Sequence, residues 1–142
     1  MSDLPALRVS GIVESSLYVA DLGRAESFYR GLFGFERLVG DDRFCALAVC
    51  AGQVLLLFRR GGSLKPIETP EGTIPPHDGD GQLHVAFAAN ADELDEWERH
   101  LAAEDIEVES RMQWPAGGES VFFRDPDGHL VELVTPGVWA VY

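Results

Sequence analysis

The sequence predicts an α+β fold made of two tandem βαβββ modules. Residues 11–59 show the alternation of one strand, then helical spacing, then the alternation of three short strands, and residues 82–136 repeat this order. A shift of 70 residues places Glu14 over His84 and Leu17 over Phe87, and a shift of 76 places residues 54–57 over 130–133. A stretch rich in glycine and proline, residues 60–81, separates the two modules as a linker. We therefore treat residues 1–142 as one domain with an internal repeat.

The first module begins with an alternating strand at 11–20, preceded by a loose leader at 1–10. Asp21 is a plausible N-cap for the following helix and Gly34 a plausible stop. Its apolar stripe comprises Leu22, Ala25, Phe28, Tyr29 and Leu32. Three strands are expected at about 36–39, 44–50 and 53–58, with "AGQ" as a hairpin signal between the last two.

The second module repeats these signals. "QLHVAFAA" at 82–89 predicts a strand, and residues 90–105 predict a helix with Asn90 or Asp92 near its cap. The stripe of this helix comprises Leu94, Trp97 and Leu101. Strands are expected at 106–114, 120–125 and 129–136, separated by the turns "PAGG" and "PDG".

Composition and charge narrow the function classes. A formal net charge of −13 disfavours nucleic acid and anionic membranes as partners, because both attract clustered Lys and Arg. Cys45 and Cys50 lie about 16 Å apart along a strand at about 3.3 Å per residue, too far for a disulfide. We expect both to be small buried apolar residues of a reducing compartment. The start does not resemble a signal peptide and no apolar run reaches 18 residues, so a cytoplasmic location is expected.

Three ionisable residues share one kind of position. Glu14, His84 and Glu132 lie on strand faces opposite the helix-side rows, so they meet if both sheets curl around one cavity. Singly, each is explained as a core histidine or a solvated glutamate. Their equivalent placement across a repeat favours a divalent cation, since buried carboxylates are costly unless paired or metal-bound. This donor set suits Fe, Mn, Ni, Co or Zn without selecting one.

Three segments carry a resemblance to a known family. "LYVADLGRAESFYRGLFGFE", "HVAFAANADELDEW" and "FRDPDGHLVELVTP" together resemble the vicinal oxygen chelate (VOC) superfamily of glyoxalase I, extradiol dioxygenases, fosfomycin-resistance enzymes and bleomycin-resistance proteins. The likeness runs from about residue 11 to 136. It implies the glyoxalase/bleomycin resistance/dihydroxybiphenyl dioxygenase fold, a cup-shaped mixed sheet with helices outside. It also implies a homodimer, a small-molecule substrate and a divalent metal.

The resemblance assigns roles to particular positions. The metal ligands fall on Glu14, His84 and Glu132, while the remaining ligand position falls on Leu56, which cannot ligate. Glu14 stands where the family usually has His, and the reduced set weakens a glyoxalase I assignment and resembles the dioxygenases and fosfomycin enzymes. Glu14 and Glu132 are the candidate catalytic carboxylates, with Glu14 as the candidate base.

Substrate-binding residues are predicted from shared faces. Ser16 and Tyr18 share the face of Glu14, and Arg124 is a candidate for an anionic substrate group, with pairing to Asp125 or Asp127 as the simpler alternative. Trp114 is a pocket wall or plain core. His77 is expected to be a solvated loop residue, His129 to bond its turn, and His100 to lie on the polar side of its helix.

Three function hypotheses remain open from the sequence. The first is a metal-dependent enzyme, lyase/isomerase or dioxygenase, acting on a small oxygenated substrate chelated to the metal. The second is a metal-free ligand-binding protein of the bleomycin-resistance type, for which the acidic charge suits a cationic ligand. The third is a partner-binding domain without a small ligand.

Overall fold

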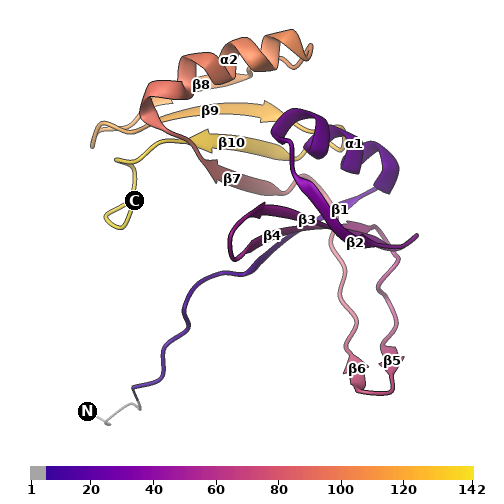
Figure 1. Ribbon diagram of the computed structural model, residues 1–142. Helices are drawn as coiled ribbons and strands as arrows, with labels where there is room; N and C mark the ends of the chain where they lie inside the picture. Colours follow the sequence, from indigo (N-terminus) through magenta and orange to yellow (C-terminus); the bar gives the residue numbers. More distant parts are fainter. Residues whose placement is uncertain (1–5) are drawn as a thin grey trace.

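The computed structural model describes residues 6–142, so half of the predicted leader, residues 1–5, lies outside the described residues. The first module contains β1 (Glu14–Val19), α1 (Leu22–Phe33), β2 (Glu36–Gly40), β3 (Phe44–Cys50) and β4 (Gln53–Arg59). The second contains β7 (His84–Ala88), a 3₁₀ turn (Ala91–Glu93), α2 (Leu94–Ala103), β8 (Ser110–Gln113), β9 (Glu119–Arg124) and β10 (Leu130–Val134). The predicted α+β fold of two βαβββ modules is confirmed (Figure 1).

The two sheets have the same topology. Their strand orders are β1-β4-β3-β2 and β7-β10-β9-β8, each with one parallel pair, β1–β4 and β7–β10. Glu14 pairs with Val54 in the first sheet, and His84 pairs with Leu130 in the second. These partners differ by the same offsets of 70 and 76 residues that the sequence repeat shows. In each module, the two candidate ligand positions therefore lie diagonally across the one parallel pair of strands.

The helix signals of the first module are confirmed. The Oδ1 atom of Asp21 accepts a hydrogen bond of 3.1 Å from the backbone N–H of Arg24. Gly34 ends α1 in the left-handed conformation, with φ of 72°, and its N–H donates to the carbonyl of Arg30. Each end of the helix thus has its own capping hydrogen bond.

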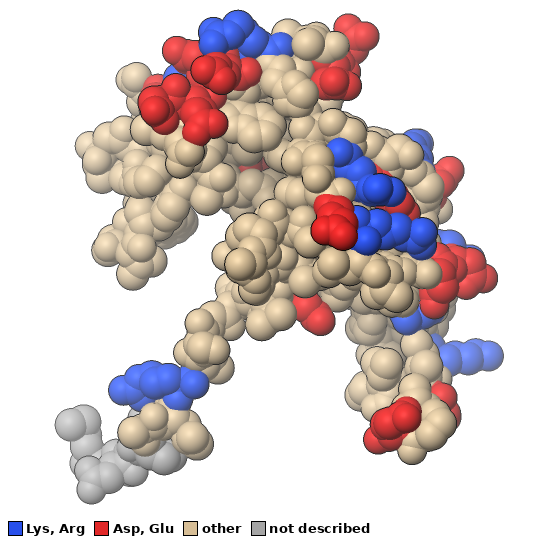
Figure 2. Space-filling view, viewed as in Figure 1, with Lys and Arg blue, Asp and Glu red and all other residues tan. Residues whose placement is uncertain are grey.

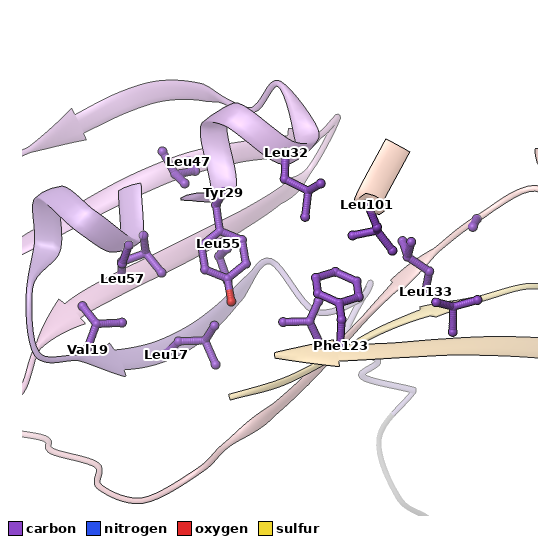
Figure 3. Close-up of a cluster of buried hydrophobic side chains, with 14 of the residues drawn as sticks. Leu17, Val19, Tyr29, Leu32, Leu47, Leu55, Leu57, Leu101, Phe123 and Leu133 are labelled. Atoms are coloured by element: carbon purple, nitrogen blue, oxygen red, sulfur yellow. The ribbon is translucent and has the colours of Figure 1, made fainter. Parts of the chain in front are cut away.

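One hydrophobic core joins the two modules. Leu17, Leu55 and Leu57 from the helix side of the first sheet belong to the same buried cluster as Phe123 and Leu133 from the second (Figure 3). Aromatic rings continue this contact, because the ring of Phe33 in α1 lies close to those of Phe87 in β7 and Trp97 in α2. The side chains on the helix side of both sheets are thus buried in the core, and a site can form only on the opposite faces of the sheets.

The linker contains structure that the sequence reading omitted. A two-stranded hairpin, β5 (Ile67–Thr69) and β6 (Gly72–Ile74), projects away from the two sheets (Figure 1). The hydroxyl of Thr69 accepts from the N–H groups of Glu71 and Gly72, which stabilises the tight turn. The signal was a "TPEG" turn flanked by β-branched residues.

The cysteine prediction was half right. Both cysteines are free, as expected, but only Cys45 is buried and Cys50 is exposed. Cys50 is the last residue of β3, where the strand turns toward the "AGQ" hairpin and leaves the core. No helix among residues 6–142 is long and apolar enough to cross a membrane.

The "DPDG" turn between β9 and β10 holds the two modules together. The phenol of Tyr29 in α1 donates a hydrogen bond of 2.7 Å to Oδ2 of Asp125. Oδ1 of Asp127 accepts one of 2.8 Å from the N–H of Ala20 at the end of β1. Both carboxylates thus reach from the second module into the first.

His129 completes this connection. Its backbone N–H bonds Asp125 within the turn, as the sequence suggested, but its imidazole reaches further. The Nδ1 atom accepts from the N–H of Leu83, and the Nε2–H donates 2.7 Å to the carbonyl of Tyr18. His129 is fully buried and ties the start of β7 to β1, the two strands that carry candidate ligands.

Candidate metal centre

The open face of the second sheet carries a hollow beside the C-terminal segment. Its volume is about 380 Å³. Its walls are largely apolar and aromatic, and two ionisable side chains, from β7 and β10, lie among them. The lining residues are His84, Ala86, Trp114, Phe122, Glu132, Val134, Val138 and Trp139. We refer to this hollow as the His84 pocket.

His84 and Glu132 meet in this pocket. Strand β7 runs parallel to β10, with His84 opposite Leu130 and Ala86 opposite Glu132, so the two side chains lie diagonally on one face. The Nε2 atom of His84 is 3.2 Å from Oε1 of Glu132. The His84 side chain is 50% exposed and that of Glu132 only 11%. The pair therefore has a buried carboxylate and an imidazole open to an incoming group.

The imidazole of His84 has a fixed tautomer. Its Nδ1 lies 2.9 Å from the carbonyl oxygen of Leu130, and a carbonyl can only accept, so Nδ1 carries the hydrogen. In a neutral ring, the lone pair of Nε2 then faces the Glu132 carboxylate, which is repulsive unless a cation or a proton lies between them. A metal-binding histidine usually donates its other ring N–H to a backbone carbonyl or a carboxylate, which fixes the orientation of the ring.

Glu132 is oriented by two further side chains. The hydroxyl of Ser120 donates a hydrogen bond of 2.5 Å to Oε2 of Glu132. The indole N–H of Trp114 in turn donates 2.8 Å to the oxygen of Ser120. This relay occupies one carboxylate oxygen and leaves Oε1 directed at His84.

The His84–Glu132 pair has a geometry that suits a divalent ion. Two neighbouring ligands at right angles, each about 2.1 Å from a metal, lie about 3.0 Å apart. The observed separation of 3.2 Å is close to that value. One imidazole and one carboxylate with fixed orientations thus supply two of the donors that such an ion requires.

Glu14 does not join this pair within one chain. It is the first residue of β1 and is exposed on the open face of the other sheet. Among residues 6–142, no group of three or more His, Cys, Asp or Glu side chains could hold a metal ion. Leu56 takes the place in the first sheet that Glu132 has in the second, and it is half-buried. The chain therefore assembles two of its three predicted ligands, and Glu14 remains a prediction.

The other predicted residues on β1 lie away from the His84 pocket. Ser16 is exposed on the face of Glu14, while the Tyr18 hydroxyl lies 2.6 Å from Nδ1 of His77. His77 also packs edge-on against Phe58, with ring centroids 4.5 Å apart, so the expectation of a solvated loop histidine was wrong. Burial raises the pKa of Tyr18, and the nearby Asp78 raises it further. Tyr18 and His77 thus fasten the end of the linker to the first sheet.

Arg124 has a partner of its own. Its Nε lies 2.7 Å from Oε2 of Glu109, and its Nη1 donates to the carbonyl of Gly128. The pairing is therefore with Glu109 and not with Asp125 or Asp127. Arg124 does not line the His84 pocket, so its role toward substrate stays a prediction.

The remaining predicted residues divide between pocket and scaffold. Trp114 is a pocket wall, as one of the two sequence readings had it. His100 was expected on the polar side of its helix, but its Nε2–H donates 2.9 Å to the carbonyl of Leu32 and caps the end of α1. Sequence reasoning missed Ser120 and Trp139. Ser120 shares the alternation of Phe122 and could have been found, whereas Trp139 follows the last strand and no pattern indicates it.

Charged side chains are distributed unevenly over the surface. Figure 2 shows acidic and basic groups gathered over α2 and α1, while the C-terminal segment at the left carries none. The lining of the His84 pocket contains no Lys or Arg. The net charge of −13 therefore belongs mainly to the outer surface, and the pocket is apolar with one buried acid.

Known proteins were compared with the chain. The family model of the Glyoxalase/Bleomycin resistance protein/Dioxygenase superfamily matches residues 11–133. A metallothiol transferase FosB from Shouchella clausii is 29% identical over 129 residues, covering 89% of this chain and 81% of that protein. The fosfomycin resistance protein FosX from Listeria innocua is 30% identical over 132 residues, covering 88% and 89%.

Solved structures agree with this family. The lactoylglutathione lyase from Agrobacterium tumefaciens is 37% identical with a TM-score of 0.84, covering 93% of this chain and 98% of that one. A mutant FosX from Listeria monocytogenes, complexed with Mn(II) and 1S,2S-dihydroxypropylphosphonic acid, has a TM-score of 0.65 at 24% identity, covering 89% and 90%. That second likeness concerns the fold alone. With the family model matching most of its length, the chain belongs to the glyoxalase/bleomycin resistance protein/dioxygenase superfamily.

Proposed function

We propose that the protein is a divalent-metal-dependent enzyme acting on a small oxygenated substrate. His84 and Glu132 would each supply one ligand to the metal. The observation that carries this proposal is the orientation of His84, whose Nδ1–H is bound by the Leu130 carbonyl while Nε2 faces Glu132 at 3.2 Å. Manganese, iron, nickel, cobalt and zinc are the candidate ions, because imidazole and carboxylate donors suit each of them.

The third ligand of the proposed site is Glu14 from a second copy of the chain. Glu14 occupies in the first sheet the position that His84 occupies in the second. Strands β1 and β7 are both edge strands of their sheets, so Glu14 and His84 each lie at a sheet edge that no strand of the same sheet covers. A homodimer with one first module and one second module at each site would bring Glu14 to the pair.

The side chains have separable roles in the proposed reaction. The metal supplies Lewis acidity to oxygens of the substrate. Glu132, oriented by Ser120, and His84 would hold the ion, and the oxygen of Glu14 that does not ligate would take a proton from the substrate. Trp114 and Phe122 limit the entry of water. This arrangement serves lyase or isomerase chemistry, and it serves dioxygenase chemistry when the ion is Fe or Mn.

A second candidate function is metal-free ligand binding. Its support is that a protonated His84 would satisfy Glu132 at the observed 3.2 Å without any ion. Aromatic rings around a buried acid, without Lys or Arg in the lining, also suit a cationic ligand. Metal binding separates the two candidates directly.

The experiment is a calorimetric titration of chelator-stripped protein with Mn(II), Fe(II), Ni(II), Co(II) and Zn(II). We expect one tight site per chain and at least ~10-fold weaker binding in the His84→Ala and Glu132→Gln variants. His77→Ala, which removes an imidazole outside the pocket, serves as the matched control and keeps the parent affinity. Equal affinity in the parent and the His84→Ala variant contradicts the proposal, and so does a parent that binds none of the five ions.

Glu14 is tested by mixing two defective chains. Glu14→Gln and His84→Ala chains, each weak alone, are co-expressed and the mixed dimer is purified with two affinity tags. If the site is shared, one of its two sites has both Glu14 and His84, so tight binding returns at one ion per dimer. Absence of any tight site in a mixed dimer contradicts the role of Glu14.

A further inference from the structure

We infer that the His84 pocket binds the planar aromatic group of a substrate between Trp114 and Trp139. This inference rests on the proposed function, because the oxygens of the same substrate would lie over His84 and Glu132. It adds the chemical class of the substrate body, an apolar aromatic ring next to the oxygen-bearing carbons. The argument comes from the walls of the pocket.

The first wall is the indole of Trp114, which is half-buried and held at two points. Its ring N–H donates 2.8 Å to the hydroxyl of Ser120, and its backbone N–H donates 2.8 Å to the carbonyl of Gly118. Ser120 also binds Glu132, so the ring and the candidate ligand share one hydrogen-bonded frame. The ring face is therefore fixed relative to the acid before any ligand enters.

The second wall is the C-terminal segment Pro136–Tyr142, which carries Trp139. The indole is 70% exposed, whereas tryptophan is highly buried on average, and the same segment also exposes Val141. The segment itself is ordered by hydrogen bonds, from the Tyr142 hydroxyl to the carbonyl of Val134 and from the Tyr142 N–H to that of Trp139. An exposed indole on a fixed backbone, at the edge of a pocket, is a preformed binding surface.

The two walls are joined by a close glycine contact. The N–H of Gly118 donates to the carbonyl of Gly137, and a Cβ atom on Gly137 would lie 2.7 Å from the Gly118 nitrogen. Gly137 also has a φ of 104°, which other residues rarely adopt. Only glycine lets the C-terminal segment approach the β8–β9 turn this closely. The spacing between the walls is thus built into the backbone.

The floor and charge of the pocket select against a strongly anionic body. Ala86, Val134 and Val138 are apolar, Phe122 adds a third ring, and no Lys or Arg contributes to the lining. A volume of about 380 Å³ accommodates one or two fused rings with their oxygens. The Trp139 wall lies beyond residues 11–133, the part of the chain that matches the family model.

The test compares three 2-hydroxy acids with the same oxygen-bearing head. Lactate carries a methyl group, hexahydromandelate a cyclohexyl ring and mandelate a planar phenyl ring. Binding of each to Mn(II)-loaded dimer is measured by calorimetry, and repeated on the metal-free protein. We expect mandelate to bind more tightly than hexahydromandelate, and lactate to bind most weakly.

Variants assign this preference to the walls. Trp139→Ala should weaken mandelate binding about tenfold, the order expected for an aromatic pair, while lactate and Mn(II) affinities stay unchanged. Trp139→Phe should retain most of the preference, and Leu64→Ala, which removes an exposed apolar side chain on the linker, should retain all of it. If the parent binds no Mn(II), the proposed function is contradicted. If the three acids bind with equal affinity, both with and without Mn(II), the inferred aromatic site between Trp114 and Trp139 is overturned.

Discussion

The phenol of Tyr29 lies 2.7 Å from Oδ2 of Asp125, and this hydrogen bond joins helix α1 to the turn between β9 and β10. Both side chains are buried, and Asp125 also accepts from the backbone N–H groups of Asp127 and His129. The carboxylate is thus saturated by donors from its own turn and from the other module. The relationship explains how two modules with a long linker stay in one arrangement.

Removal of the Tyr29 hydroxyl should lower the free energy of unfolding. A buried hydrogen bond to a charged acceptor contributes about 1.5–3 kcal/mol, so Tyr29→Phe should lose about that amount. Urea unfolding followed by circular dichroism measures the change. Tyr18→Phe, which removes a hydroxyl from a less buried position, is the control, and its free energy of unfolding should fall by less. If the two variants lose the same free energy of unfolding, the hydrogen bond to Asp125 stabilises the fold no more than the Tyr18 hydroxyl does.

Stability should decline in alkaline solution. Burial and then the neighbouring Asp125 raise the pKa of Tyr29 far above its ordinary value near 10. The unfolded chain therefore releases this proton first, so the contribution is complete below about pH 10 and is lost as pH rises above it. Cys45 acts in the same direction, because burial raises its pKa to about 11. Between pH 8 and 11, the free energy of unfolding should fall less for Tyr29→Phe than for the parent.

Replacement of His129, which lies outside the His84 pocket, should strongly lower the free energy of unfolding. Both ring nitrogens are hydrogen-bonded inside the protein, to Leu83 and to Tyr18. His129→Leu leaves a buried N–H and a buried carbonyl without partners, each worth about 1–3 kcal/mol. Thermal unfolding should show a large loss of stability. His77→Leu, which removes one hydrogen bond and one ring contact at a half-buried position, should lose less stability than His129→Leu, and the reverse order would contradict the structural role of His129.

Ser120 should act on metal affinity beyond its effect on folding. Ser120→Ala removes the donor to Oε2 of Glu132, and loss of a group that hydrogen-bonds a metal ligand typically weakens metal binding about 10–100-fold. Ser120→Thr, which keeps a hydroxyl, should restore most of the affinity. Calorimetry with Mn(II) gives the comparison. If alanine and threonine variants bind equally, the hydroxyl does not orient the carboxylate.

The two cysteines should differ in reactivity. Cys50 is exposed, while Cys45 is buried and its thiol pKa is raised to about 11. Ellman's reagent at pH 8 should therefore modify one thiol per native chain and two in denaturant. Cys50→Ser should reduce the native count to zero. Rapid reaction of both thiols in the folded parent would show that β3 opens readily.

The sequence predicted most of the fold, because the determining signals are local. Alternation and capping residues locate the strands and helices, and Asp21 and Gly34 bound α1 as expected. The hairpin at residues 67–74 was missed because two strands of three residues are too short for alternation to be visible. Cys50 was expected inside because strand alternation alone does not show where a strand leaves the core.

The candidate site was predictable only in part. His84 and Glu132 could be paired from the sequence because the register of one parallel pair fixes their faces. The position of Glu14 relative to them depends on how whole chains assemble, and no pattern within one chain encodes that. Trp139 was missed since it lies in a segment without periodicity, which reaches the β8–β9 turn through the close contact of Gly118 and Gly137.

The residues "DPDGH" open the segment "DPDGHLVEL", the most specific piece of the family resemblance, and make their contacts with the first module, with their own turn and with the N–H of Leu83. Asp125, Asp127 and His129 bind Tyr29, Ala20 and Tyr18, and none of these three lines the His84 pocket. These five residues therefore join the two modules and leave the pocket chemistry to the strand that follows them. Their pattern in a sequence indicates this architecture, and the activity has to be judged from the side chains on the open strand faces.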